Sequence, residues 1–151
     1  MPGRELTDVP IVYVTLGKLL TVLRYAKTQT GFAYSFLADL TAIDLRPEAP
    51  LFELVYNLFA PAHGWRLRIK VRIAEGTTVP SAVSLWKGAN WAEREVFDMF
   101  GIAFADHPDL RRILNDPRFQ GHPLRKDYDF RKYQIFNDAD PVLTRLLDEE
   151  K

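Results

Sequence analysis

The feature that most constrains the fold is a segment in which apolar and basic residues alternate without exception. Residues 65–73 read WRLRIKVRI, so bulky apolar side chains alternate with Arg and Lys. Side chains of a β-strand point alternately to the two faces of a sheet, so this pattern predicts a strand with one face on a core. The turn residues PAHG, 61–64, separate it from a second apolar run at 51–59, which predicts an antiparallel hairpin.

The basic face of this strand has two interpretations. Arg66, Arg68, Lys70 and Arg72 repel one another, and Glu53 on the preceding strand can relieve only part of that repulsion. The simpler interpretation is a solvated sheet surface. The sharper one is a docking face for an acidic protein surface, for the phosphates of a nucleic acid, or for the chain's own C-terminal tail.

A helix and another strand are predicted before the hairpin. Residues 15–30 carry leucines at helical spacing, with Thr15 as the expected N-cap and Gly31 as the expected stop. The apolar residues of 32–45 alternate poorly, which predicts a buried strand with irregular ends.

Three shorter helices are expected in the second half of the chain. The middle one begins at Asn90, whose side chain and that of Glu93 are spaced as a capping box, and it ends at Gly101. Pro80 and Pro108 suit the first turns of the other two, because proline has no N–H to leave unpaired there. The three helices are expected over residues 78–86, 90–100 and 108–114.

These elements predict a fold of the α/β class, more narrowly α+β. We expect a small mixed, largely antiparallel sheet with an N-terminal helix and further helices packed on it. The expected domain spans residues 1–128. Residues 129–151 are expected to form an extended C-terminal tail, with one short amphipathic stretch at 142–147.

Length and composition limit the classes of function. With 151 residues, 47% hydrophobic and 26% charged, the chain fits one globular domain. Its 20 basic and 20 acidic residues balance, which argues against a nucleic-acid binder. The absence of cysteine excludes disulfides, thiolate catalysis and thiolate ligation of iron–sulfur clusters by this chain. No secretory signal and no long apolar run are visible, so we expect a cytoplasmic protein that meets membranes only through partners.

Residues 88–127 concentrate charge in a way that suggests an active site. Glu95 and Asp98 are three positions apart on the predicted helix, and paired carboxylates can catalyse acid–base steps when their pKa values are pushed apart. A small hydrolase using these two residues near His107 is therefore one hypothesis. The structural alternative is that the carboxylates form ion pairs with nearby arginines: Arg94, Arg111 and Arg112.

Other elements of a catalytic or metal site are missing. His107 and His122 each precede a proline, and their spacing from Asp98, Asp106 and Asp109 fits no recognised metal site. We expect both histidines to hydrogen-bond local backbone. The sequence has no Gly-rich phosphate loop and no order of residues typical of a Ser-His-Asp triad. The run Arg125-Lys126-Asp127 suits either a solvated loop or an extended segment that docks on another protein.

Three stretches of this segment carry a resemblance to a known family. They read GANWAEREVFDMFGI (88–102), HPDLRRIL (107–114) and GHPLRKDY (121–128). The sequence resembles the C subunit of bacterial NADH–quinone oxidoreductase, respiratory complex I, whose counterparts are the mitochondrial 30-kilodalton subunit and the chloroplast J subunit. FLADLTAIDL, FELVYNL and VPSAVSLWKGANW resemble the family too, so the likeness covers roughly residues 32–128.

The resemblance implies a structural subunit in the hydrophilic arm of that complex. The complex as a whole couples electron transfer to quinone with proton translocation. It implies no catalytic, cofactor-binding or metal-binding residue in this chain; FMN, iron–sulfur clusters and quinone are expected in partner subunits. The implied partners are the large D-type subunit and the cluster-bearing B- and I-type subunits. The implied location is peripheral, on the cytoplasmic side of the bacterial inner membrane.

The motif match also assigns positions to a signature helix and a partner-facing end. We expect loss of Arg112 or Arg125 to damage assembly more than the fold of the chain. The assigned residues are Glu93, Arg94, Glu95, Asp98, His107, Arg111, Arg112, His122, Arg125, Lys126 and Asp127.

The electron donor stays open at this point. The domain also resembles part of the large subunit of membrane-bound NiFe hydrogenases. NADH, ferredoxin and F420H2 are therefore all retained as donors of the parent complex.

Overall fold

A computed structural model describes residues 9–29, 31, 33–131 and 134. Its centre is a four-stranded sheet in the order β1-β4-β3-β2. β3 pairs antiparallel with β2 and β4, whereas β1 pairs parallel with β4. The predicted hairpin and the largely antiparallel sheet are therefore confirmed. The strands are β1 (Ile11–Val14), β2 (Phe36–Asp44), β3 (Phe52–Ala60) and β4 (Trp65–Ile73).

The alternation along β4 separates the two faces of the sheet as expected. Ile69 lies opposite Tyr56 of β3, and both side chains are buried in the core. On the opposite face, Glu53 of β3 forms ion pairs with Lys70 at 2.8 Å and with Arg72 at 2.9 Å. One buried carboxylate thus contacts two of the four basic side chains, which confirms the partial relief predicted from the sequence.

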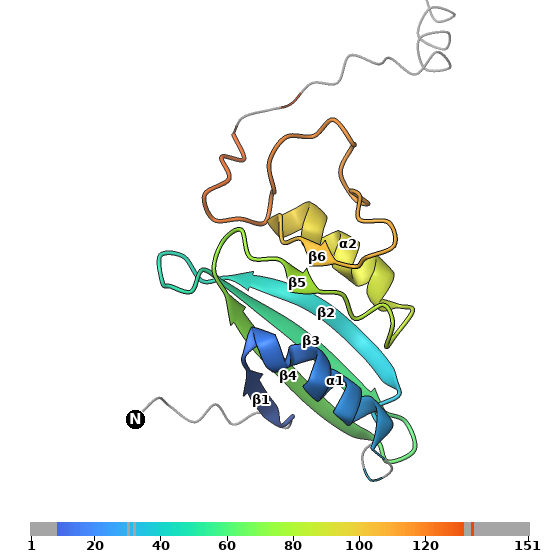
Figure 1. Cartoon of the computed structure of the whole chain (residues 1–151). Coiled ribbons are helices and arrows are strands. Elements are labelled where there is room, and N and C mark those ends of the chain that lie inside the picture. Colours follow the sequence, from blue (N-terminus) through green and yellow to red (C-terminus); the bar gives the residue numbers. More distant parts are fainter. Residues whose placement is uncertain (1–8, 30, 32, 132–133, 135–151) are drawn as a thin grey trace, which may run out of the picture.

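The two α-helices of the described residues cover the inner face of this sheet. A short 3₁₀ helix, Leu16–Lys18, leads into α1 (Leu19–Thr28), and α2 spans Ala89–Phe100. Leu23 of α1 and Val96 of α2 are buried in one continuous core with the inward side chains of the strands. Figure 1 shows α1 lying across β3 and β4, and α2 beside β2. The α+β fold expected from the sequence is confirmed.

The first helix is shorter than predicted. Thr15 has extended backbone angles before the 3₁₀ helix, but its side chain makes no capping hydrogen bond. The α-helix ends at Thr28, where Gln29 turns to extended backbone, so Gly31 is not the residue that stops it. The N-terminal turn tightens to 3₁₀ geometry, which is common at helix ends.

The helix predicted over residues 78–86 is wrong. Val79–Pro80 forms a short strand, β5, parallel to β6 (Phe104–Ala105). The amide of Val79 donates to the carbonyl of Ala103 at 2.9 Å. A partner more than twenty residues away in the sequence fixes this backbone as a strand. Local residue preferences do not indicate such a partner.

The capping box and the helix predicted over residues 108–114 are also wrong. Gly88, without a side-chain cap, precedes α2, and the carboxylate of Glu93 accepts from the amide of Ala82 at 2.6 Å. Between Asp106 and the end of the described chain the backbone forms turns and bends. The predicted stop of α2 is confirmed, because Gly101 adopts left-handed angles (φ 74°) and donates to the carbonyl of Phe97.

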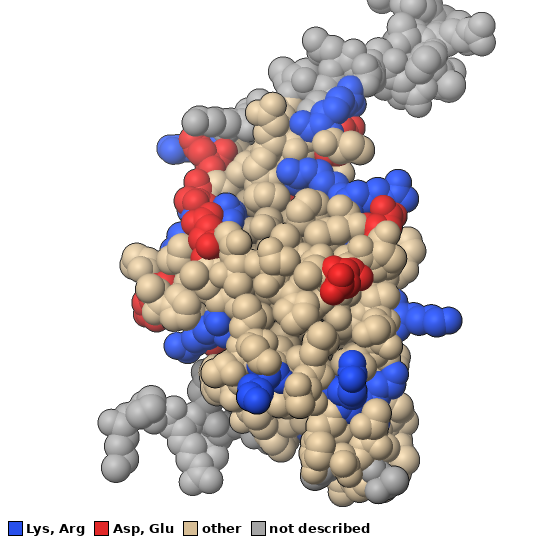
Figure 2. All heavy atoms as spheres, in the orientation of Figure 1, with Lys and Arg blue, Asp and Glu red and all other residues tan. Residues whose placement is uncertain are grey.

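The C-terminal tail lies almost wholly beyond the described residues. Only residues 129–131 and 134 of the predicted tail are described, and the amphipathic stretch at 142–147 falls outside them. No helix among the described residues has the length and apolar character needed to cross a bilayer. On the face drawn in Figure 2, positive and negative side chains are interspersed, and no large field of one sign covers it.

Candidate functional site

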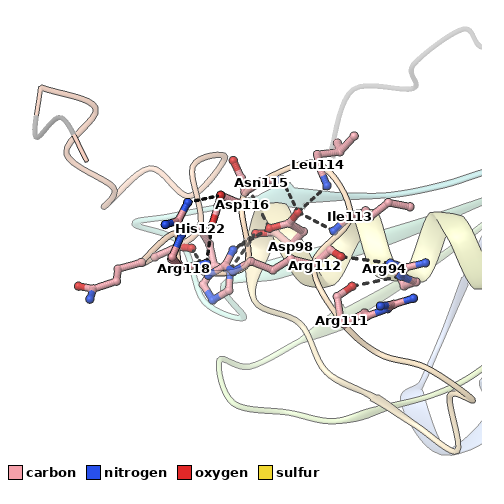
Figure 3. A network of polar contacts seen from close by, with 12 residues as sticks. Arg94, Asp98, Arg111, Arg112, Ile113, Leu114, Asn115, Asp116, Arg118 and His122 are labelled. Carbon is pink, nitrogen blue, oxygen red and sulfur yellow. Dashed lines mark hydrogen bonds and ion pairs between the residues drawn. The ribbon is translucent and has the colours of Figure 1, made fainter. Parts of the chain in front are cut away.

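The charged residues of α2 hold the irregular segment that follows β6. We call residues 106–128 the latch segment, because side chains of α2 and of the sheet bind its backbone. Asp98 is fully buried, and its carboxylate accepts hydrogen bonds from the backbone amides of residues 113–115 at 2.8–3.0 Å. Arg112 and Asn115 add side-chain donors at 2.6 and 2.9 Å. Figure 3 shows these donors converging on the Asp98 carboxylate.

This environment decides the protonation state of Asp98. Burial alone would raise its pKa, but the hydrogen bonds from Asn115, Arg112 and Ile113 outweigh burial and hold the pKa well below its usual value. The carboxylate therefore stays ionised at neutral pH, with every approach filled by donors of its own chain. It is not placed to exchange a proton with a substrate.

Two arginines complete the binding of the latch segment to α2. Arg112 donates to the Asp98 carboxylate and, from its other terminal nitrogen, to the carbonyl of Gly121 at 2.9 Å. Arg94 does not pair with Asp98, although it lies one turn before it. Its guanidinium donates instead to the carbonyls of Arg111 and Arg112, both at 3.1 Å. These residues therefore act as hydrogen-bonding groups for backbone that has no helix or strand partner.

Glu93 and His107 fix the start of α2 to its surroundings. Glu93 accepts from the hydroxyl of Ser81 at 2.7 Å and from the amide of Ala82, which ties β5 to the helix. Burial raises the pKa of Glu93, although these hydrogen bonds oppose the rise. The Nδ1 of His107 accepts from the amide of Asp109 at 3.0 Å, so its Nε2 carries the proton and donates to the carbonyl of Asn90 at 3.1 Å.

His122 packs against the end of α2. Its Nδ1 donates to the main-chain carbonyl of Asp98 at 2.9 Å. Burial lowers the pKa of His122, and the charges of Arg125 and Arg112 lower it further. A Cβ added to Gly101 would lie only 2.5 Å from the imidazole. Both histidines thus hydrogen-bond backbone, but only the bond between His107 and Asp109 is local as expected; the bonds to the carbonyls of Asn90 and Asp98 join distant parts of the sequence.

The basic run at the end of the latch segment reaches back to the sheet. Arg125 donates to the carbonyl of Phe100 at 2.7 Å and pairs with Glu75 at 2.8 Å. The amide of Lys126 donates to the carboxylate of Asp44 at 2.8 Å, and its ammonium to the carbonyl of Arg46 at 2.7 Å. An ion pair also joins Asp127 to Arg46. Much of this run is therefore occupied within the chain, and its contact with a partner stays a prediction.

The paired-carboxylate hypothesis fails on geometry. Glu95 is exposed, and among the described residues it makes no hydrogen bond or ion pair, whereas Asp98 is enclosed by donors. Because Asp98 is fully buried and Glu95 is exposed, the two carboxylates do not line one open site. Within the described part of the chain, no group of three or more His, Asp or Glu side chains is arranged to hold a metal ion.

The residues that receive the latch segment were not predicted from the sequence. Asp44, Arg46 and Glu75 are far from it in the chain, so no local spacing connects them. Asn115 carries one detectable signal, since it follows HPDLRRIL directly and has a side chain suited to hydrogen-bonding a turn.

A comparison of the sequence with models of known protein families identifies the family of this chain. The model described as respiratory-chain NADH dehydrogenase, 30 Kd subunit, matches residues 12–134. The chain belongs to this family. The resemblance noted from the motifs of the 30 Kd subunit family is thus confirmed, and the match includes α2 and the whole latch segment.

Curated relatives of the 30 Kd subunit family agree with this assignment. The 30.4 kDa subunit of mitochondrial NADH-ubiquinone oxidoreductase from Neurospora crassa is 43% identical over 126 residues, covering 83% of this chain and 44% of the relative. The C 2 subunit of NADH-quinone oxidoreductase from Rhizobium etli is 44% identical over 117 residues, covering 78% of this chain and 63% of the relative. This chain therefore spans about two fifths to two thirds of the length of these relatives.

A solved structure of the family supports the fold. The trypsin-resistant fragment (1-134) of Nqo5 superposes with a TM-score of 0.60 at 33% sequence identity. The superposition covers 66% of this chain and 81% of that fragment.

Proposed function

We propose that the chain is a cofactor-free structural subunit in the hydrophilic arm of an NADH–quinone oxidoreductase, a complex that couples electron transfer to proton translocation. The observation that carries the proposal is the family match over residues 12–134. The contacts of the signature charges support it, because Glu93, Arg94 and Asp98 bind backbone and form no catalytic group with other residues that the structure describes. NADH is favoured over ferredoxin or F420H2 as donor, since the relatives named above are NADH oxidoreductase subunits.

The proposal extends to partners, cofactors and location. The large D-type subunit and the cluster-bearing B- and I-type subunits are the partners we propose. We propose that FMN, iron–sulfur clusters and quinone lie in partner chains. For the clusters, this sequence supplies no cysteine ligand. The proposed location is peripheral, on the cytoplasmic side of the bacterial inner membrane, with membrane attachment through partners.

Two other functions receive less support. A nucleic-acid module on β4 would need a continuous basic track, but Glu53 lies between Lys70 and Arg72 and pairs with both, and the guanidinium of Arg68 is bound to Asn57 at 2.9 Å. A hydrolase would need Glu95 and Asp98 in one pocket, and the two side chains lie in different environments.

Co-purification from membranes of the native organism tests the proposal. A tagged full-length chain is expected to carry the other subunits of the complex and NADH–quinone reductase activity with it. The chain purified alone is expected to contain no stoichiometric flavin or iron. A bound cofactor in the lone chain, or isolation of the tagged chain free of those subunits, would overturn the assignment.

A further inference from the structure

A hollow lined by arginines lies beside α2. Its volume is about 390 Å³, and it is lined by Arg94, Arg111, Arg112 and Pro117. Among the described residues no carboxylate contributes to this lining. We call it the arginine hollow. Figure 3 shows Arg94 and Arg111 together at one end of the polar network.

The charges around the arginine hollow are not balanced. Arg112 is matched by the buried carboxylate of Asp98, and Arg111 by the exposed carboxylate of Asp109 at 2.9 Å. Arg94 is only 9% exposed, yet it forms no ion pair with any described residue. The polar partners of its guanidinium are two neutral carbonyl groups, and a buried guanidinium without a carboxylate partner favours an anion nearby.

The rim of the arginine hollow indicates what carries that anion. Trp91 is 64% exposed, and the guanidinium of Arg94 lies 5.3 Å from the centre of its ring. Tryptophan and arginine beside a partly desolvated pocket are the residues that contribute most binding energy at protein interfaces. A small inorganic anion would neutralise the arginines but leave the indole in water. A protein segment can cover both.

We propose that the arginine hollow receives an aspartate or glutamate side chain of a neighbouring subunit, with Trp91 packing against the segment that carries it. The inference rests on the proposed function, since it requires a parent complex. The planar guanidinium groups of Arg94 and Arg111 are suited to a carboxylate, which accepts two parallel hydrogen bonds. Nucleic acid is disfavoured, because a phosphate backbone needs a continuous basic track.

A zero-length cross-link tests the chemistry directly. In the complex assembled with Arg111→Lys, a water-soluble carbodiimide couples the new amine to any carboxylate that touches it. Mass spectrometry is expected to find a peptide joined from position 111 to an Asp or Glu of another subunit. Arg24→Lys, at an exposed position on α1, is the matched control and is expected to give no such product. Coupling only to Asp109 of the same chain, or no coupling at position 111, would overturn the inference.

Retention in the complex provides the second readout. Arg111→Glu and Trp91→Ala are each expected to reduce the amount of chain retained in the complex by at least about 10-fold at moderate salt, with Arg24→Glu unchanged. The melting temperature of the purified full-length variants is expected to stay at the wild-type value, because both side chains are exposed. Full retention of both variants alongside a wild-type chain that co-purifies would reject the arginine hollow and leave the proposed function standing. A wild-type chain that fails to co-purify would overturn both.

Discussion

At the scale of single residues, Asp98 fixes the position of the latch segment by binding its backbone amides. Its buried carboxylate takes hydrogen bonds from three consecutive amides, and Arg112 supplies the counter-charge. Asn in its place would remove the charge and present a donor to other donors. We expect Asp98→Asn to lower the free energy of unfolding by about 3–5 kcal/mol, measured by urea denaturation.

A neighbouring carboxylate provides the control for Asp98. Glu95 lies on the same helix but is exposed, so Glu95→Gln is expected to change stability by less than about 0.5 kcal/mol. Equal losses in the two variants would show that helix charge in general, rather than the buried site, stabilises the segment.

The low pKa of Asp98 also predicts how stability depends on pH. In the unfolded chain an Asp titrates near about 3.9, and in the folded chain the pKa of Asp98 lies lower. The unfolded state therefore binds the proton first as pH falls, so this contribution is complete above about pH 4 and is lost below it. We expect urea midpoints to fall more steeply between about pH 4 and pH 2.5 in the wild type than in Asp98→Asn.

Gly101 combines two requirements in one residue. Its φ of 74° disfavours any side chain, and an added Cβ would meet the ring of His122 at 2.5 Å. We expect Gly101→Ala to destabilise the chain by at least about 1–2 kcal/mol in thermal or urea unfolding. Gly88 has ordinary helical angles and open space around it, so Gly88→Ala is expected to be neutral or stabilising by up to about 1 kcal/mol.

At the scale of elements, the sequence predicts what local periodicity encodes. The strict alternation of residues 65–73 and the glycine that ends α2 both appear in the structure. The segments at 78–86 and 108–114 carry helix-starting prolines, yet neither is a helix. The backbone amides of these segments donate to distant acceptors instead. In the first segment the acceptor is the carbonyl of Ala103, and in the second it is the Asp98 carboxylate. Such partners become visible only when the chain is folded.

The latch segment is expected to respond to mild acid through His122. Burial lowers the pKa of this imidazole, so the unfolded chain, with a His near about 6.5, binds the proton first. Stability from the neutral imidazole is therefore present above about pH 6.5 and is lost as pH falls toward the folded pKa. We expect unfolding midpoints of the wild type to drop from pH 7.5 to pH 5.5, and His122→Gln to show a smaller drop. Parallel pH profiles would contradict this role.

At the scale of the whole molecule, the fold uses most of the signature charges to attach one irregular segment to α2 and to the sheet. The sequence motifs place those charges in the family, but they do not separate residues that hold the chain from residues that face outward. That separation depends on burial. Arg111 and Arg112 are neighbours in the sequence, and their side chains are 72% and 16% exposed.

This pair of arginines allows folding and assembly to be distinguished. Arg112→Ala leaves the Asp98 carboxylate buried without its counter-charge and the Gly121 carbonyl without its donor, so the lone chain is expected to lose about 2–4 kcal/mol of stability. Arg111→Ala removes an exposed ion pair and is expected to cost less than about 1 kcal/mol, while weakening retention in the complex. Urea unfolding of the purified chains and co-purification from membranes measure the two effects. The sequence predicts that loss of Arg112 damages assembly more than the fold, whereas the structure predicts that it damages the fold first. An Arg112→Ala chain that is stable but fails to assemble would support the prediction from the sequence.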